Sequence, residues 1–146
     1  MAINLVLGNK ETLYFNPSLQ VGVALAGHHT NKDPARRDFF AKPSGTVAMG
    51  GGKEMDCFVF ETANGEQLYA AASNEYCYVA KEGEEENKDP AMRQWVAMAN
   101  GDGTMVLSLK DGRQMYTNTS GWVGVARENC HSNTDVGRRH WSQQKP

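Results

Sequence analysis

The chain has 146 residues, a length typical of one folded domain, and no apolar run approaches the roughly 18–20 residues that span a bilayer. Apolar residues make up 40% and charged residues 22%, which argues against disorder and favours a globular protein. The net charge of −2 and the pI of about 6.1 argue against nucleic acid or an anionic membrane as a partner.

The beginning of the chain and the cysteines indicate the compartment. The first seven residues lack the basic segment and the long apolar core of a signal peptide. The cysteines are Cys57, Cys77 and Cys130, an odd number without a Cys-x-x-Cys pair. We therefore expect reduced thiols, a cytoplasmic location and no structural zinc.

Short segments rich in Val, Tyr and Trp predict β-strands of about five residues. In the first third of the chain the expected strands lie at 4–7, around Tyr14, at 21–26 and at 39–41. In the second third they lie at 57–61, around Tyr69, at 76–80 and at 95–99. In the last third they lie at 104–109, around Tyr116, at 122–126 and at 141–143.

The connections between these strands also carry signals. Asn64-Gly65 and Asp111-Gly112 predict two-residue type I′ hairpin turns, and Gly8-Asn9 holds the matching place in the first third. The Asp-Pro-Ala segments at Asp33 and Asp89 predict one helical turn, because Asp caps a helix and Pro suits its first position.

One pattern recurs three times: a tyrosine, a Val-rich strand, an Asn-x-Asp pair and a large aromatic residue. The tyrosine precedes the aspartate by 19, 20 and 19 residues, and the aspartate precedes the aromatic by 6 in every copy. The aspartates (Asp33, Asp89 and Asp135) are 56 and 46 residues apart, and the extra ten residues predict a longer loop at 42–55.

Units this short do not bury their own apolar faces, so the three must share one core. We expect a single domain over 1–146, with repeats at about 1–56, 57–103 and 104–146. Closure of the three around a pseudo-threefold axis leaves few exposed sheet edges. The sequence therefore predicts an all-β protein of about twelve strands with the architecture of a β-trefoil.

The third copy, from Val123 to Trp141, resembles the repeat of ricin B-type lectins: a strand, a loop with Asn and Asp, and a final aromatic where that family has Gln-x-Trp. Phe39 replaces one of the tryptophans. The chain is also similar in size, and in its lack of disulfides and of a signal peptide, to intracellular fungal β-trefoil lectins. The resemblance implies binding of galactose or N-acetylgalactosamine, and red-cell agglutination.

The aromatic residues of the repeat are expected in the core, since large aromatics are usually buried. They are the final aromatics Phe39, Trp95 and Trp141 and the tyrosines Tyr14, Tyr69 and Tyr116.

The Asn-x-Asp loops have two interpretations. Their asparagines, Asn31, Asn87 and Asn133, either hold turns or bind sugar hydroxyls, which need donors and acceptors. The arginines that follow, Arg37, Arg93 and Arg139, either pair with the aspartate of the same unit or contact ligand.

A sugar site also needs an aromatic ring for the C–H face of a pyranose. Tyr76 and Trp122 precede the third strand at equivalent positions, where the first copy has Gln20, and should be partly exposed. The remaining ligand candidates are polar groups of the second strand and of the following loop: Asn16, Asn118, His28, His29 and His131. The Asn118, Trp122, His131 and Asn133 set suggests that the third unit has the most competent of three unequal sites.

These patterns favour a binding protein over an enzyme, because nucleophile elbows, phosphate loops and His-Glu-x-x-His motifs are absent from the sequence. We expect glycans of glycoproteins or glycolipids as partners, with no cofactor, no metal, no nucleic acid and no membrane insertion. A β-trefoil protease inhibitor acting through the 42–55 loop is the alternative. The oligomeric state, a homodimer included, stays open.

Overall fold

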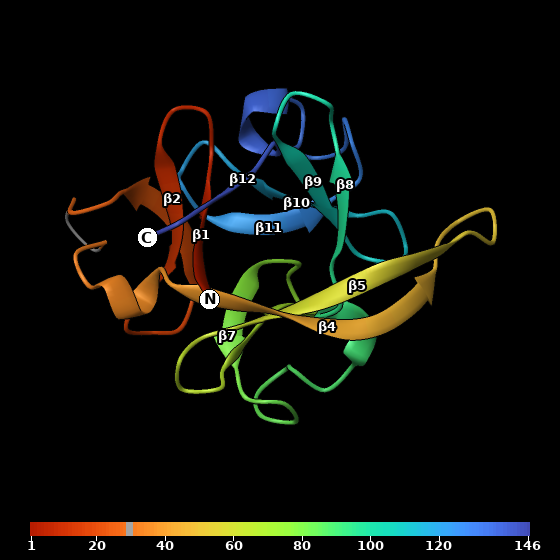
Figure 1. The fold of residues 1–146 in the computed structure, drawn as a ribbon, viewed down its shortest axis with the longest axis horizontal. Coiled ribbons are helices and arrows are strands. Elements are labelled where there is room, and N and C mark those ends of the chain that lie inside the picture. The colour runs from red at the N-terminus through yellow and green to blue at the C-terminus, as the bar shows by residue number, and fades with distance from the viewer. Residues whose placement is uncertain (29–30) are drawn as a thin grey trace.

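The computed structural model describes residues 1–28 and 31–146 and arranges them in three similar units (Figure 1). The first unit contains β1 (Ala2–Val6), β2 (Glu11–Phe15), β3 (Val21–Leu25), the 3₁₀ turn η1 (Pro34–Arg36) and β4 (Phe39–Ala48). The second contains β5 (Glu54–Glu61), β6 (Gln67–Ala70), β7 (Cys77–Ala80), η2 (Pro90–Met92) and β8 (Val96–Ala99). The third contains β9 (Met105–Ser108), β10 (Gln114–Thr117), β11 (Val123–Ala126), η3 (Val136–Arg138) and β12 (Ser142–Gln144). The described residues contain no helix long and apolar enough to cross a membrane.

The first and fourth strands of each unit close a six-stranded barrel. Regular antiparallel pairing joins β12 to β1, β1 to β4, β4 to β5 and β8 to β9. Two single bridges complete the ring, Phe58 with Trp95 and Met105 with Trp141. The second and third strands form three hairpins, β2–β3, β6–β7 and β10–β11, which meet at one end of the barrel. The all-β fold is therefore a β-trefoil of twelve strands within the described residues, as the sequence predicts.

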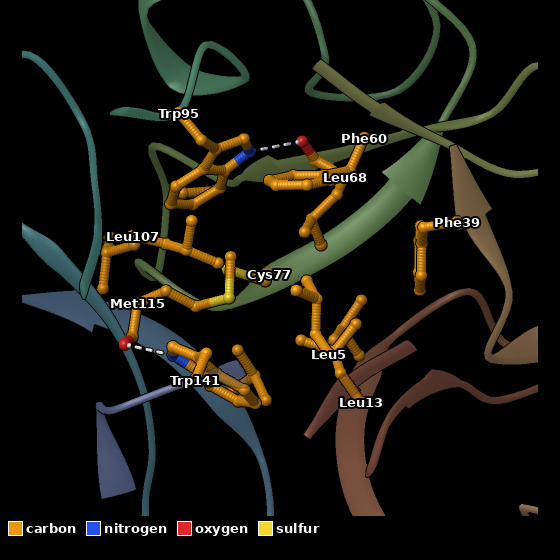
Figure 2. Close-up of a cluster of buried hydrophobic side chains, with 14 of the residues drawn as sticks. Leu5, Leu13, Phe39, Phe60, Leu68, Cys77, Trp95, Leu107, Met115 and Trp141 are labelled. Atoms are coloured by element: carbon orange, nitrogen blue, oxygen red, sulfur yellow. Dashed lines mark hydrogen bonds between the residues drawn. The ribbon is translucent and has the colours of Figure 1, made fainter. Parts of the chain in front are cut away.

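The core contains the threefold aromatic layer that the repeat predicts (Figure 2). Phe39, Trp95 and Trp141 are fully buried. The indole Nε1 of Trp95 donates to the carbonyl oxygen of Leu68, and that of Trp141 to the carbonyl oxygen of Met115, both at 3.1 Å. The tyrosines of the repeat are buried too, also as expected: Tyr14, Tyr69 and Tyr116.

The hairpin turns between the first and second strands differ from the prediction. They hold three residues, not two, because Lys10, Gly65 and Gly112 alone take a positive φ in each turn. Each of these residues donates its backbone N–H to the residue three positions earlier, at 2.9–3.0 Å. This is the type I turn followed by a left-handed residue, whereas type I′ needs two positive φ angles. Lys10, not Gly8, holds the glycine position in the first unit.

The segment predicted as a long loop at 42–55 is a projecting hairpin arm, built from β4 and β5 (Figure 1). The strands pair as far as Ala48 and Glu54, and a three-residue turn, 50–52, is closed by a 2.8 Å bond from Met49 N to Lys53 O. Pro43 and Gly45 suggested a loop, but the register shifts between Pro43 and Thr46, and this bulge accommodates them in a strand.

Candidate functional site

The three asparagines proposed as sugar ligands are buried. Asn31, Asn87 and Asn133 have no exposed surface. Each donates its side-chain amide to the carbonyl oxygen at the end of the preceding Val-rich strand, at 2.8 to 3.0 Å. The amide replaces a backbone partner and closes the loop on the strand. Of the two interpretations, the structure shows the turn-holding one, and the ligand assignment is wrong for lack of accessible surface.

The three arginines bind these asparagines and not the aspartates. Nη1 of Arg37 donates to the Asn31 carbonyl oxygen at 3.1 Å, and Nη1 of Arg93 to Oδ1 of Asn87 at 3.2 Å. Arg139 repeats the contact with Asn133 at 3.4 Å. Arg93 and Arg139 are 8% and 5% exposed, so neither offers its guanidinium to a ligand, and Arg37 is half-buried.

The aspartates of the Asn-x-Asp pairs cap the 3₁₀ turns, which the sequence predicts for Asp33 and Asp89 but not for Asp135. Oδ1 of Asp33, Asp89 and Asp135 accepts the backbone N–H two residues later at 2.9 to 3.0 Å. The arginines nearest to two of them come one residue earlier than expected: Arg36 lies 4.0 Å from Asp33, and Arg138 lies 3.7 Å from Asp135. The brace expected at Arg37, Arg93 and Arg139 is therefore absent from the described residues.

The second-strand asparagines hold the β2–β3 and β10–β11 turns. Oδ1 of Asn16 accepts two backbone N–H bonds, from Ser18 and Gln20, at 2.9 and 3.0 Å. Oδ1 of Asn118 makes the same pair of contacts with Ser120 and Trp122. Both asparagines are half-buried, and neither lines the two clefts described below. In the second unit the β6–β7 turn is one residue longer, and Oδ1 of Asn74 accepts the backbone N–H of Tyr76 at 3.0 Å.

The hairpin aromatics cross from one unit to the next. Trp122 of the third unit bridges to Gly22 of the first, and Tyr76 of the second bridges to Gly124 of the third. Both rings are half-buried, as expected. The site predicted within the third unit is thus divided, because Trp122 lies over the first unit whereas His131 lies in a cleft with Tyr76. Within the described residues, each of the two clefts below is lined by two units.

The first inter-unit hollow, here named the Tyr76 cleft, has a volume of about 240 Å³. It is lined by Asn74, Glu75, Tyr76, Tyr116, Gly124, Val125, His131 and Ser132. The hydroxyl groups of Tyr116 and Ser132 share a hydrogen bond of 2.9 Å, and His131 and Ser132 are exposed. Glu75 is held by Arg113, whose Nη1 lies 3.1 Å from its Oε2. The Tyr76 cleft therefore joins the half-buried ring of Tyr76 with donors and acceptors from two different units.

The second hollow, the Tyr78 cleft, has a volume of about 350 Å³ and occupies the equivalent place between the first and second units. It is lined by Ser18, Leu19, Tyr69, Tyr78, Val79, Glu85 and Glu86. Sequence analysis did not identify Tyr78, Glu85 or Ser132. The signal was present in the repeat, because Tyr78 stands where the other units have Gly22 and Gly124.

The third equivalent position lies beside Trp122. This position lies between the third and the first unit, and the first unit contributes Gly22, against which Trp122 packs. The residues that correspond to His131 and Ser132 are His29 and Thr30, which lie outside the described residues, so the prediction for His29 stays a prediction. His28, which is exposed, aligns with Cys130 and not with His131. Gln20 bridges to Tyr78 in the same way as the hairpin aromatics bridge to their glycines.

Over residues 1–28 and 31–146, no group of three or more His, Cys, Asp or Glu side chains could hold a metal ion. Neither cleft is built around such a group.

Comparisons with known proteins identify the fold alone. No family model matches the sequence, and no curated protein matches it. Among solved structures 111 chains match, and one is the designed threefold-symmetric protein ThreeFoil. Its TM-score is 0.65 and the alignment covers 99% of each chain at 11% identity. The match supports the β-trefoil fold and its threefold symmetry; at this identity it carries no function.

Proposed function

We propose that the protein is a carbohydrate-binding lectin with unequal sites between its units, and that the Tyr76 cleft is the site for a neutral sugar. The observation that carries this proposal is the half-buried Tyr76 ring beside His131, Ser132 and Tyr116. A pyranose offers an apolar C–H face and a ring of hydroxyls, and it needs a flat apolar surface with donors and acceptors around it. A hollow of about 240 Å³ suits one monosaccharide unit of a glycan.

The unequal chemistry of the clefts also supports this reading. Where the Tyr76 cleft has His131 and Ser132, the Tyr78 cleft has Glu85 and Glu86. More than one site per chain would let weak sugar affinities combine into avidity on a cell surface. Galactose and N-acetylgalactosamine are the first sugars to test, since the ricin B-type resemblance implies them.

A glycan array followed by titration of the best monosaccharide tests the proposal. His131→Ala should weaken binding about threefold to tenfold, the effect of one or two hydrogen bonds of about 0.5–1.5 kcal/mol each. Cys130→Ala is the matched control, because Cys130 is the exposed neighbour of His131 and does not line the cleft. Affinity should survive a chelator. Absence of binding to any glycan, or equal affinity of the two variants, would contradict the proposal.

A protease inhibitor is the second candidate, and the β4–β5 arm favours it. The arm projects from the barrel (Figure 1). Lys53 is exposed and pairs with Met49 at the closing turn. A protruding basic residue could enter the specificity pocket of a trypsin-like protease. Inhibition of such a protease that is lost in Lys53→Ala would support this candidate, and no inhibition at micromolar protein would remove it.

A further inference from the structure

The Tyr78 cleft is lined by two aromatic rings. Tyr69 is 3% exposed and Tyr78 is half-buried, with their ring centroids 6.1 Å apart and their planes inclined at 34°. The Tyr78 hydroxyl accepts a 2.9 Å hydrogen bond from Nδ2 of Asn74, which fixes its ring. A cavity of about 350 Å³ thus has two tyrosines among its lining residues. Such a lining attracts cations, because ring faces are negative.

The cleft also has one carboxylate without a partner. Glu85 is exposed and lines the cavity, and within residues 1–28 and 31–146 its carboxylate has no hydrogen-bond or ion-pair partner. Glu86 differs, because its two oxygens accept from the backbone N–H and the hydroxyl of Ser73 at 3.2 and 2.8 Å. Of the described residues that line the cleft, none is a lysine or an arginine. The negative charge of Glu85 is therefore free to meet a ligand.

The tyrosine rings and the Glu85 carboxylate both favour a positively charged ligand. Burial raises the pKa of the Tyr69 hydroxyl; a backbone contact from Glu86 opposes this shift, and the negative charges of Glu86 and Glu85 add to it. The phenol is therefore neutral at physiological pH, and the carboxylates are the charges at the cavity. A cation in this place would meet ring faces and a carboxylate together.

We propose that the Tyr78 cleft binds a protonated amine carried by a ligand of monosaccharide size. The ammonium would contact Glu85 and the tyrosine rings, and the hydroxyl of Ser18 on the facing wall would accept or donate to the rest of the ligand. An amino sugar or a simple cyclic amine offers this chemistry. The site is distinct from the Tyr76 cleft, which has His131 at the position equivalent to Glu85 and takes a neutral ligand in the function proposed above.

Titration with D-glucosamine and N-acetyl-D-glucosamine tests the charge requirement, since the two differ by acetylation of the amine. At a pH below 7 and low salt, glucosamine should bind about tenfold more tightly, and its affinity should fall as salt rises. Equal affinity for the two sugars, or no binding of glucosamine, would overturn the proposal. Cyclohexylamine separates the contribution of the ammonium group from that of the sugar hydroxyls. If it binds as tightly as glucosamine, the amine alone is recognised; if it binds more weakly, the hydroxyls contribute.

A pair of charge-matched variants tests the residue. Glu85→Gln should weaken glucosamine binding about tenfold, whereas Glu84→Gln should leave it within about twofold. Glu84 is the exposed neighbour on the same loop and does not line the cleft, so both variants change the net charge equally. Equal losses of glucosamine affinity in the two variants would mean that only the overall negative charge of the loop matters, and would overturn the proposed site.

Discussion

The indole ring of Trp122 lies against Gly22, a contact between the last unit of the chain and the first. A Cβ atom on Gly22 would lie 3.4 Å from Cε3 of the ring and 2.9 Å from the carbonyl oxygen of Gly121. The same carbonyl accepts the backbone N–H of Val23 at 2.9 Å. The glycine therefore lets one hairpin approach the next closely enough to form this bond.

The other two inter-unit bridges also contain one aromatic residue each. Tyr76 packs on Gly124, where a Cβ would lie 3.6 Å from Cδ1 of the ring. At the remaining bridge Gln20 replaces the aromatic, and the facing glycine position holds Tyr78. Each bridge thus pairs one aromatic residue with a smaller or more slender partner. The hairpin residue supplies the ring at two of the bridges, and the facing strand residue, Tyr78, supplies it at the third.

Gly22→Ala should destabilise the protein by about 1–3 kcal/mol, the usual effect of overpacking. The new methyl group would meet a backbone oxygen at 2.9 Å, which has little freedom to move. Gly8→Ala is the matched control, because a Cβ there meets nothing within 4 Å. Urea unfolding of both variants measures the effect. Equal stability of the two would contradict the close approach.

An exchange of volumes tests the reciprocal bridge between Gln20 and Tyr78. Tyr78→Gly should destabilise the protein by about 2–3 kcal/mol, because it removes a half-buried ring and adds glycine flexibility in a strand. Gln20→Tyr added to Tyr78→Gly creates the arrangement of the other two bridges and should recover part of the loss. The coupling free energy in a double-mutant cycle measures this recovery. A coupling near zero would show that the two positions do not share volume.

The fold was predictable because one spacing recurs three times, and a repeat specifies which residues share a layer: Phe39, Trp95 and Trp141 follow from it directly. The 3₁₀ turns after Asp33 and Asp89 were predictable because each aspartate accepts a backbone N–H two residues away and is followed by proline. The candidate site in the Tyr76 cleft was not predictable, because its walls come from neighbouring units. No spacing within one copy of the repeat places Tyr76 beside His131. The burial of Asn87 was also not evident, since turn and ligand roles use the same amide.

Replacement of the buried tryptophans should act on stability. Trp95→Ala and Trp141→Ala should each cost about 3–5 kcal/mol, a large part of the total stability of a small domain. Trp95→Phe should cost less, about 1–2 kcal/mol, because it keeps a ring as Phe39 does but leaves the Leu68 carbonyl without its indole donor. Thermal or urea unfolding ranks the stabilities of these variants. An alanine variant with unchanged stability would contradict the core position.

The cysteines should differ in reactivity and give a stability that depends on pH. Burial raises the pKa of the Cys57 and Cys77 thiols, most strongly at Cys77, whereas Cys130 is exposed. Since the thiolate is the reactive form, a thiol reagent should label about one equivalent in the native protein, and Cys130→Ser should remove it. Above pH of about 8.5, thiols of the unfolded chain lose protons that the folded state keeps.

The free energy of unfolding should therefore fall as pH rises through this range, by at most about 1.4 kcal/mol per pH unit for each buried thiol. Urea unfolding under reducing conditions at pH 7.5 and 9.5 measures the slope. The Cys77→Ala variant should have a smaller slope than the parent, because it lacks the thiol whose pKa is raised most. An equal slope in both proteins would assign the pH dependence to other groups.

Asn87→Ala should destabilise the protein without a direct effect on ligand binding. Nδ2 of Asn87 donates to the Ala80 carbonyl and to Oε1 of Gln67, both at 2.9 Å, and its Oδ1 accepts from Arg93. Removal leaves these buried partners unsatisfied, which costs about 2–3 kcal/mol. Asn64→Ala is the control at an exposed turn position and should change stability by less than about 0.5 kcal/mol. Below the unfolding transition, the Asn87 variant should keep the parent's sugar affinity. If it kept the parent's stability and lost sugar binding, Asn87 would be a ligand residue and the loop-closing role would be wrong.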